Sequence, residues 1–186
     1  MKEKITSTLL LVFVGLLAGC GYNLVGKGGA LPRDVKRISI PLFKNETLET
    51  GLEALVTDAV VESFMKRGGL QVTETSPDAV LKGTVTAYKL KRLSYDSAGI
   101  ANEFRISISV KVELTELKTD KALFPATTLS VEKDYKVDEM ISDLYPLSPD
   151  HDAGNINTRQ QAQQKVLKLA SADLASKITS AMLDTF

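Results

Sequence analysis

The chain has 186 residues, of which 23 are basic and 23 acidic, so its formal net charge is zero. This balance excludes the broad positive field that nucleic-acid-binding proteins use, and we expect no nucleic-acid partner. With one cysteine and one histidine, the chain has no internal disulfide and too few ligands for a zinc site built from His and Cys.

The first residues have the pattern of a bacterial export signal. Lys2 and Lys4 precede an apolar run over residues 5–16. A membrane-spanning helix needs roughly 20 apolar residues, so this run is too short to cross a bilayer comfortably. We therefore predict a cleaved signal peptide rather than a membrane span.

The run Leu17-Ala18-Gly19-Cys20 resembles a bacterial lipobox, in which the cysteine thiol is lipidated and becomes the new N-terminus. The alternative is an ordinary secretory cleavage site followed by a free thiol. Acyl chains such as palmitate on Cys20 would hold the protein on a membrane, since each buried methylene contributes about 0.8 kcal/mol. Gly21, where aspartate would indicate retention in the inner membrane, points by resemblance to the outer membrane.

These features predict three parts of the chain. Residues 1–19 form the lipoprotein signal peptide, residues 20–34 a lipidated, glycine-rich linker, and residues 35–186 a single domain. The expected location is the outer membrane, on its periplasmic side, with the protein held there by its lipid anchor.

The domain opens with a strand, a helix and a second strand. Val35–Leu42 alternates apolar and polar residues, and Pro41 indicates an edge strand or the end of the strand. Thr50 and Glu53 have the spacing of a capping box at the start of a helix. One face of this helix is apolar, at Leu52, Leu55, Val56, Ala59, Val60 and Phe64, and the helix is expected to end at Gly68 and Gly69.

A short strand over Leu70–Glu74 follows this helix. A strand, a helix and a strand in this order predict a right-handed crossover between parallel strands. Three longer strands come next, at Val80–Tyr88, 104–115 and Ala126–Tyr135, and their short connections predict an antiparallel meander. In the first of them one face is expected to carry Leu81, Gly83, Val85 and Ala87.

The last part of the chain contains a loop and a helix. The loop covers residues 137–157, and the helix starts near Thr158 with Leu167, Ala170, Leu174, Ile178 and Ala181 on one stripe. Both helices can cover the apolar side of the sheet. The predicted fold class is therefore α+β, a two-layer sandwich in which a mixed, mostly antiparallel sheet carries two helices packed on one face.

No group of residues in the sequence indicates catalysis. Asp150-His151-Asp152 could ligate a metal, but a solvated acidic loop is the better explanation, because a zinc site needs three or four ligands and the chain has no other His and no Cys besides Cys20. No nucleophile–base pair is evident. We expect no enzyme, no metal and no cofactor.

Six basic residues are expected at one end of the meander. They come from the end of its first strand, the start of its second and the end of its third: Lys89, Lys91, Arg92, Arg105, Lys133 and Lys136. One interpretation is protection of an edge strand by charge. The other is a site for an anionic ligand such as the phosphates of a lipid, which arginine binds through two hydrogen bonds.

Several segments resemble the family of lipopolysaccharide-assembly lipoproteins (LptE). These segments span nearly the whole chain after the signal peptide: Cys20-Gly21-Tyr22-Asn23-Leu24, Leu31-Pro32, Val35–Pro41, Phe43-Lys44-Asn45-Glu46-Thr47 and Ala79-Val80-Leu81-Lys82-Gly83-Thr84-Val85. The long alternating strand and the alanine-rich last helix are also similar to that family.

This resemblance implies a non-enzymatic α+β lipoprotein that plugs the lumen of the outer-membrane β-barrel LptD. Such a protein supports assembly of the barrel and contacts lipopolysaccharide on its way to the cell surface. Cys20 would be its lipidated residue. The alternative function is a stand-alone periplasmic lipoprotein that binds an anionic lipid or solute for a transporter, which predicts a deep apolar pocket.

Overall fold

A computed structural model of the protein describes residues 32, 35–67, 69–97, 99, 101–137 and 156–183. The predictions about the signal peptide, the linker, Cys20 and His151 fall outside these ranges, as does most of the predicted loop after Val137. The description below concerns this part of the chain.

The strands form one mixed sheet. Its order is β3 (Gln71–Val72), β1 (Arg37–Ser39), β4 (Ala79–Tyr95), β5 (Ala101–Glu116) and β6 (Ala122–Lys136). A further short strand, β2 (Lys44–Asn45), pairs with β4 beyond the end of β1. The pairs that involve β1, β2 and β3 are parallel, whereas β4–β5 and β5–β6 are antiparallel.

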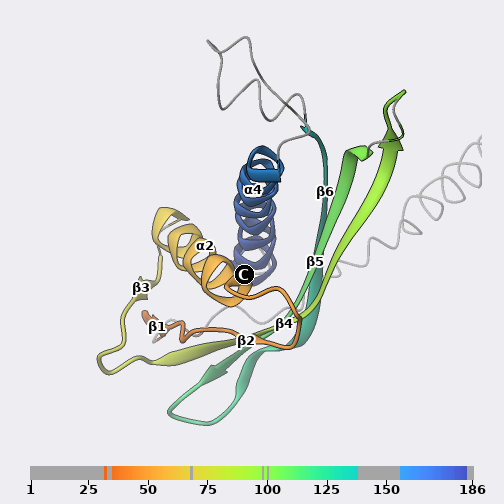
Figure 1. The fold of residues 1–186 in the computed structure, drawn as a ribbon. Helices are drawn as coiled ribbons and strands as arrows, with labels where there is room; N and C mark the ends of the chain where they lie inside the picture. The colour runs from red at the N-terminus through yellow and green to blue at the C-terminus, as the bar shows by residue number, and fades with distance from the viewer. Residues whose placement is uncertain are drawn as a thin grey trace, which may run out of the picture.

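Two helices in the described part of the chain, α2 (Leu52–Arg67) and α4 (Ile156–Leu183), lie on the same side of the sheet. They pack on each other; α2 contacts β2, β3 and β4, and α4 contacts β5 and β6 (Figure 1). The predicted fold class is confirmed. No helix among the described residues has the length and apolar character that crossing a bilayer requires.

The alternation of β5 explains this two-layer arrangement. Its even-numbered residues from Ile106 to Leu114 are fully buried beneath the helices, and the odd-numbered residues between them are polar and partly or fully exposed. Burial of this apolar set on one face fixes the register, because a shift by one residue would turn the whole set toward water. The opposite face of the sheet carries no helix in the described residues, and we call it the helix-free face.

The parallel part of the sheet is as the sequence predicts, with differences in its details. β1, which precedes α2 in the sequence, and β3, which follows it, pair in parallel. Helix α2 ends before Gly69, whose φ of +89° suits glycine. Pro41 lies outside β1. The predicted hydrogen bond from the Glu53 backbone N–H to the Thr50 side chain is absent among the described residues. Glu53 caps the helix instead, because its carboxylate interacts first with its own backbone N–H, accepts a hydrogen bond from Asn45 and interacts more weakly with the backbone N–H of Gly51.

An irregularity in β4 changes which residues face the helices. The register shifts between Val85 and Ala87, so Ala87 pairs with Ser109 and Tyr88 pairs with the buried Ile108. The prediction that Ala87 continues the buried face is therefore wrong. A β-bulge inserts one residue and reverses the alternation beyond it.

The end of α4 also differs from the prediction in one position. Leu167, Ala170, Leu174 and Ile178 are buried, but the stripe ends on the fully buried Met182 rather than on Ala181. Ala181 lies three residues after Ile178 and Met182 lies four residues after it, and both spacings are compatible with the same face of a helix. Met182 takes the buried position, where its longer side chain points into the core.

Candidate functional site

The strand registers bring the six predicted cations to the same end of the sheet. Lys91 pairs with Arg105, which in turn pairs with Asp134 on β6. The remaining four lie within three residues of this row along their strands, at Lys89, Arg92, Lys133 and Lys136. We call these six residues the cationic end.

The six side chains do not share one face. Alternation from the buried Ile106 and Ile108 puts Lys89, Lys91, Arg105 and Lys136 on the helix-free face, and Arg92 and Lys133 on the face of the helices. The cationic end is therefore divided between the two sides of the sheet.

Acidic partners neutralise two of these cations. Arg105 donates hydrogen bonds from Nε and Nη2 to the two carboxylate oxygens of Asp134, at 2.6 and 2.7 Å, and Glu132 lies 3.6 Å from its Nη1. These bonds raise the pKa of Arg105 and lower that of Asp134. On the other face, Lys133 Nζ lies 2.7 Å from the Asp173 carboxylate of α4. In both pairs the positive charge of the cation is balanced by a carboxylate of the same protein.

Lys89, Lys91 and Arg92 are exposed and form no salt bridge within the described ranges. They lie where the outer edge of β4 has no strand partner among the described residues, because β2 pairs only as far as Val85. Protection of an open edge therefore remains a sufficient explanation for these three cations.

A hollow of about 450 Å³ lies beside the cationic end, on the side of the helices. Phe104 and Tyr135 stack in its wall with ring centroids 5.4 Å apart. Burial, followed by the proximity of Tyr88, raises the pKa of Tyr135 to about 12. Gln163 of α4 donates a hydrogen bond of 3.1 Å to the Tyr88 hydroxyl. The hollow thus has aromatic walls and amide groups, with Arg92 at its margin.

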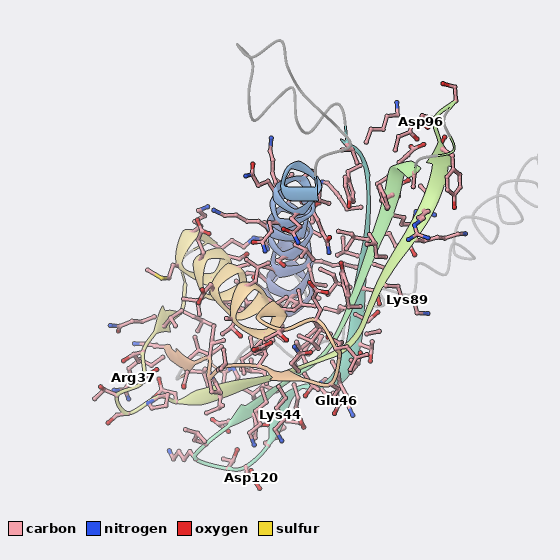
Figure 2. The ribbon with its side chains drawn as sticks, in the orientation of Figure 1. Arg37, Lys44, Glu46, Lys89, Asp96 and Asp120 are labelled. Atoms are coloured by element: carbon pink, nitrogen blue, oxygen red, sulfur yellow. The ribbon has the colours of Figure 1, made fainter. Side chains whose placement is uncertain are left out.

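A second group of cations, which the sequence analysis missed, lies near the centre of the sheet. Lys44, Lys82 and Lys111 line a hollow of about 500 Å³ on the helix-free face. Figure 2 labels Lys44, and it lies well apart from Lys89 along the sheet. We call these three residues the central lysine group.

The register explains how three separate segments form this group. Lys44 on β2 and Lys111 on β5 both pair with Thr84, one on each side of β4. Lys82 is the next residue of β4 on the same face. The available sequence signal was the alternation of β5, which already assigned Lys111 to the polar face. The pairing of β2 with β4 has no such signal, because β2 has only two residues.

The segments that carry the family resemblance have structural roles. The ring of Phe43 fills the space above Gly83, where an added Cβ would lie 2.4 Å from ring carbons. Asn45 donates hydrogen bonds to the Glu49 carbonyl at 2.8 Å and to Glu53 at 2.7 Å, which hold the turn before α2.

Asp78 connects the start of β4 to β1. Its carboxylate accepts hydrogen bonds from the backbone N–H of Arg37 at 2.9 Å and of Lys36 at 3.1 Å, and from Arg37 Nη2 at 2.9 Å. The bond from the Arg37 side chain, followed by the two backbone bonds, holds the pKa of Asp78 far below its ordinary range. This cluster fixes the parallel strands and leaves little of the carboxylate for a ligand.

Within the described residues, no group of three or more His, Cys, Asp or Glu side chains is arranged to hold a metal ion. The chemistry that these residues do offer is binding by charge, hydrogen bonds and an aromatic wall.

A family model described as "LptE: Lipopolysaccharide-assembly" matches residues 35–182. A search of curated proteins finds no match.

Several solved structures are similar to this chain at low sequence identity. Protein XCC0632 from Xanthomonas campestris is 15% identical over 84% of this chain and 89% of that protein, with a TM-score of 0.50. A putative lipoprotein from Caulobacter crescentus is 18% identical over 76% of this chain and 88% of its own, with a TM-score of 0.49. Rare lipoprotein B from Shewanella oneidensis is 13% identical over 80% of this chain and 98% of its own, with a TM-score of 0.44. At 15% identity the likeness to protein XCC0632 concerns the fold alone.

Proposed function

Because the chain belongs to the LptE family of lipopolysaccharide-assembly proteins, we propose that it is an outer-membrane lipoprotein that plugs the LptD β-barrel. In this role it supports assembly of the barrel and helps deliver lipopolysaccharide to the cell surface. The observation that carries the proposal is the family match over residues 35–182, which covers both layers of the fold.

The surface chemistry supports a plug. The lumen of a large outer-membrane barrel is polar. The helix-free face is polar as well. Between β5 and β6 on this face, the Ser109 hydroxyl lies 2.8 Å from that of Ser130, and Arg105 is paired with Asp134. A polar face of this kind contacts a polar lumen without the cost of burying unmatched apolar surface.

The barrel partner is tested by purification. The full-length chain with an affinity tag is isolated from outer membranes dissolved in a mild detergent, and LptD is expected to co-purify in stable proportion. Recovery of the chain alone, at detergent concentrations that leave other outer-membrane complexes intact, would contradict the plug.

The anchor is tested separately at Cys20. The variant Cys20→Ala is expected to lose its acyl chains, seen as a lower mass of the mature protein, and to move in part from the membrane to the soluble fraction. Retention by the barrel reduces this release, so the fraction released should rise further when LptD is depleted. An unacylated thiol in the wild-type protein would contradict the lipoprotein assignment.

The cationic end is proposed to bind the phosphates of lipopolysaccharide. Reversal of charge at Lys91, Arg92 and Lys136 to Glu is expected to weaken binding of purified lipopolysaccharide, with the largest loss at low salt. A matched variant reverses Lys118, Lys121 and Lys168, which are exposed and lie on the β5–β6 turn and on α4. Equal binding by the two variants would remove the cationic end from the mechanism and leave the plug unaffected.

The same experiments separate this function from a stand-alone lipoprotein that binds a solute. That alternative predicts a chain without a barrel partner and a ligand in the hollow beside Phe104 and Tyr135. Co-purification with LptD decides against it.

A further inference from the structure

We infer that the central lysine group is a binding site for a phosphate group, separate from the cationic end. Its centre is Thr84, which has Lys44 on one neighbouring strand and Lys111 on the other. Lys82 lies on the same face two residues before Thr84. This inference does not depend on the barrel partner.

The spacing allows the three ammonium groups to converge on one anion. Neighbouring strands lie about 4.8 Å apart, so the backbones of Lys44 and Lys111 are about 10 Å apart across Thr84. Lys82 is about 7 Å along β4 from the same point. Lysine carries its charge on a flexible four-carbon stem, and all three side chains border the same hollow of about 500 Å³. An anion above Thr84 is therefore within reach of each of them.

Edge protection does not explain Lys111. It lies on β5, which pairs with β4 on one side, at Thr84, and with β6 on the other, at Thr128. No open backbone is present there for a charge to guard. In this respect Lys111 differs from Lys89, Lys91 and Arg92, which lie along the open part of β4.

Neutralisation within the protein does not explain the central lysine group either. None of the three lysines forms a salt bridge in the described part of the chain, whereas Arg105 and Lys133 each have an acidic partner within 2.7 Å. One acid, Glu113, borders the same hollow and pairs in register with Lys82. Glu46 follows Lys44 two residues later and does not line the hollow. The local balance in the hollow is three positive charges against one negative charge, in a chain whose total charge is zero.

The ligand chemistry follows from the donors. Ammonium groups and a hydroxyl provide hydrogen-bond donors to several oxygens at once, and a phosphate near neutral pH offers three such oxygens with a charge of −1.5 to −2. The hollow also has an apolar margin at Pro41, Leu42 and Ala126, of which Leu42 is 65% exposed. A phosphate that belongs to a lipid headgroup and a free phosphate share this chemistry, and the apolar margin favours the lipid.

The test titrates the full-length ¹⁵N-labelled chain, in a neutral detergent, with inorganic phosphate and with dihexanoyl phosphatidic acid. Both are expected to shift the amide resonances of Thr84 and Lys111 saturably, and chloride and dihexanoyl phosphatidylcholine are expected to leave them in place. Binding of the phosphatidic acid at least about tenfold tighter than phosphate identifies a lipid headgroup, and equal affinities identify a free phosphate. Absence of saturable shifts with both phosphates overturns the inference without any variant.

Three variants with the same change of charge locate the site. The substitutions Lys44→Gln, Lys82→Gln and Lys111→Gln together are expected to weaken phosphate binding at least about tenfold, because each removes a charge-assisted hydrogen bond. The change Lys118→Gln, Lys121→Gln and Lys168→Gln is expected to stay within about twofold of the wild type, since screening at 0.15 M salt removes effects beyond about 8 Å. An equal loss in both would show general attraction of anions and overturn the site.

The third variant separates the two proposals. Lys91→Gln, Arg92→Gln and Lys136→Gln change the cationic end and are expected to preserve the shifts at Thr84. Loss of those shifts in this variant would merge the two groups into one site and contradict the inference. Loss of the barrel partner, in contrast, leaves the phosphate titration unchanged.

Discussion

The central part of the sheet and its far end are built from the same strands but are stabilised differently. In the central part, β4 has neighbours on both sides, and Phe43 packs against Gly83 beneath α2. At the far end β4, β5 and β6 continue alone among the described strands (Figure 1). A pair of aromatic rings lines an open hollow there. The stability of the central part depends on close packing, and that of the far end depends on strand register and on pairs of opposite charges.

The cations of the two regions also differ. At the far end Arg105 and Lys133 are paired with acids, and the exposed cations of β4 lie along an edge without a strand partner among the described residues. In the tightly packed centre none of the three lysines forms a salt bridge in the described part of the chain, and Lys111 lies on a strand that is paired on both sides. The comparison teaches that a cation is a better candidate for ligand binding where the backbone around it is already paired.

The largest expected effect compares two leucines of β4. Leu81 is fully buried in the central part, and Leu90 at the far end is 42% exposed. Leu81→Ala should destabilise the fold by about 2–5 kcal/mol, because it removes buried methylenes and leaves a cavity. Leu90→Ala should change it by less than about 0.5 kcal/mol. Urea unfolding followed by circular dichroism measures both, and similar losses would break the contrast between the two regions.

A smaller effect is expected at Gly83. An added Cβ would lie 2.4 Å from the ring of Phe43, so Gly83→Ala should destabilise the protein by about 1–3 kcal/mol through overpacking. Phe43→Leu in the same chain should recover part of this loss, because the smaller side chain relieves the overlap. A double-mutant cycle with these two changes measures the coupling. Additive losses would show that the ring does not limit residue 83.

The smallest effect concerns two aspartates and the pH. The pKa values of Asp78 and Asp134 are both lowered in the folded protein, chiefly by hydrogen bonds from Arg37 and Arg105. Each carboxylate therefore stabilises the fold above its unfolded pKa, near 3.8, and this contribution disappears as the pH falls through the folded pKa.

Asp78→Asn and Asp134→Asn should each lower the melting temperature at pH 7, and Asp78→Asn should lower it more. Asp78 also accepts two backbone hydrogen bonds, which Asp134 does not do among the described contacts. The difference from the wild type should shrink as the pH is lowered below about 4. A difference that is constant between pH 7 and pH 2 would show that the lost stability comes from contacts other than the charge.

Much of the fold was predictable because local patterns and long-range packing agree. The alternation of β5 and the apolar stripes of α2 and α4 each select one buried face, and packing both helices on the apolar side of the sheet buries all three faces together. The predictions failed where a single extra residue reverses the alternation of side chains along a strand. The bulge after Val85 reverses the side of Ala87, and no local pattern marks it.

The candidate site was predictable in part for the same reason. A meander brings the ends of consecutive strands together, so the six cations of the cationic end meet at one end of the sheet. Their division between two faces, and the acids that pair with two of them, depend on exact register. The central lysine group was missed because Lys44 reaches it through a two-residue parallel strand.

The sequence by itself determined the order of the strands and helices other than β2, the α+β class and the resemblance to the family, because hydrophobic periodicity and short connections are local properties. The tertiary structure alone decided which charges are paired and which three lysines share a hollow. Charges interact through space over a few ångströms, and residues 44, 82 and 111 become neighbours only when β2, β4 and β5 are aligned.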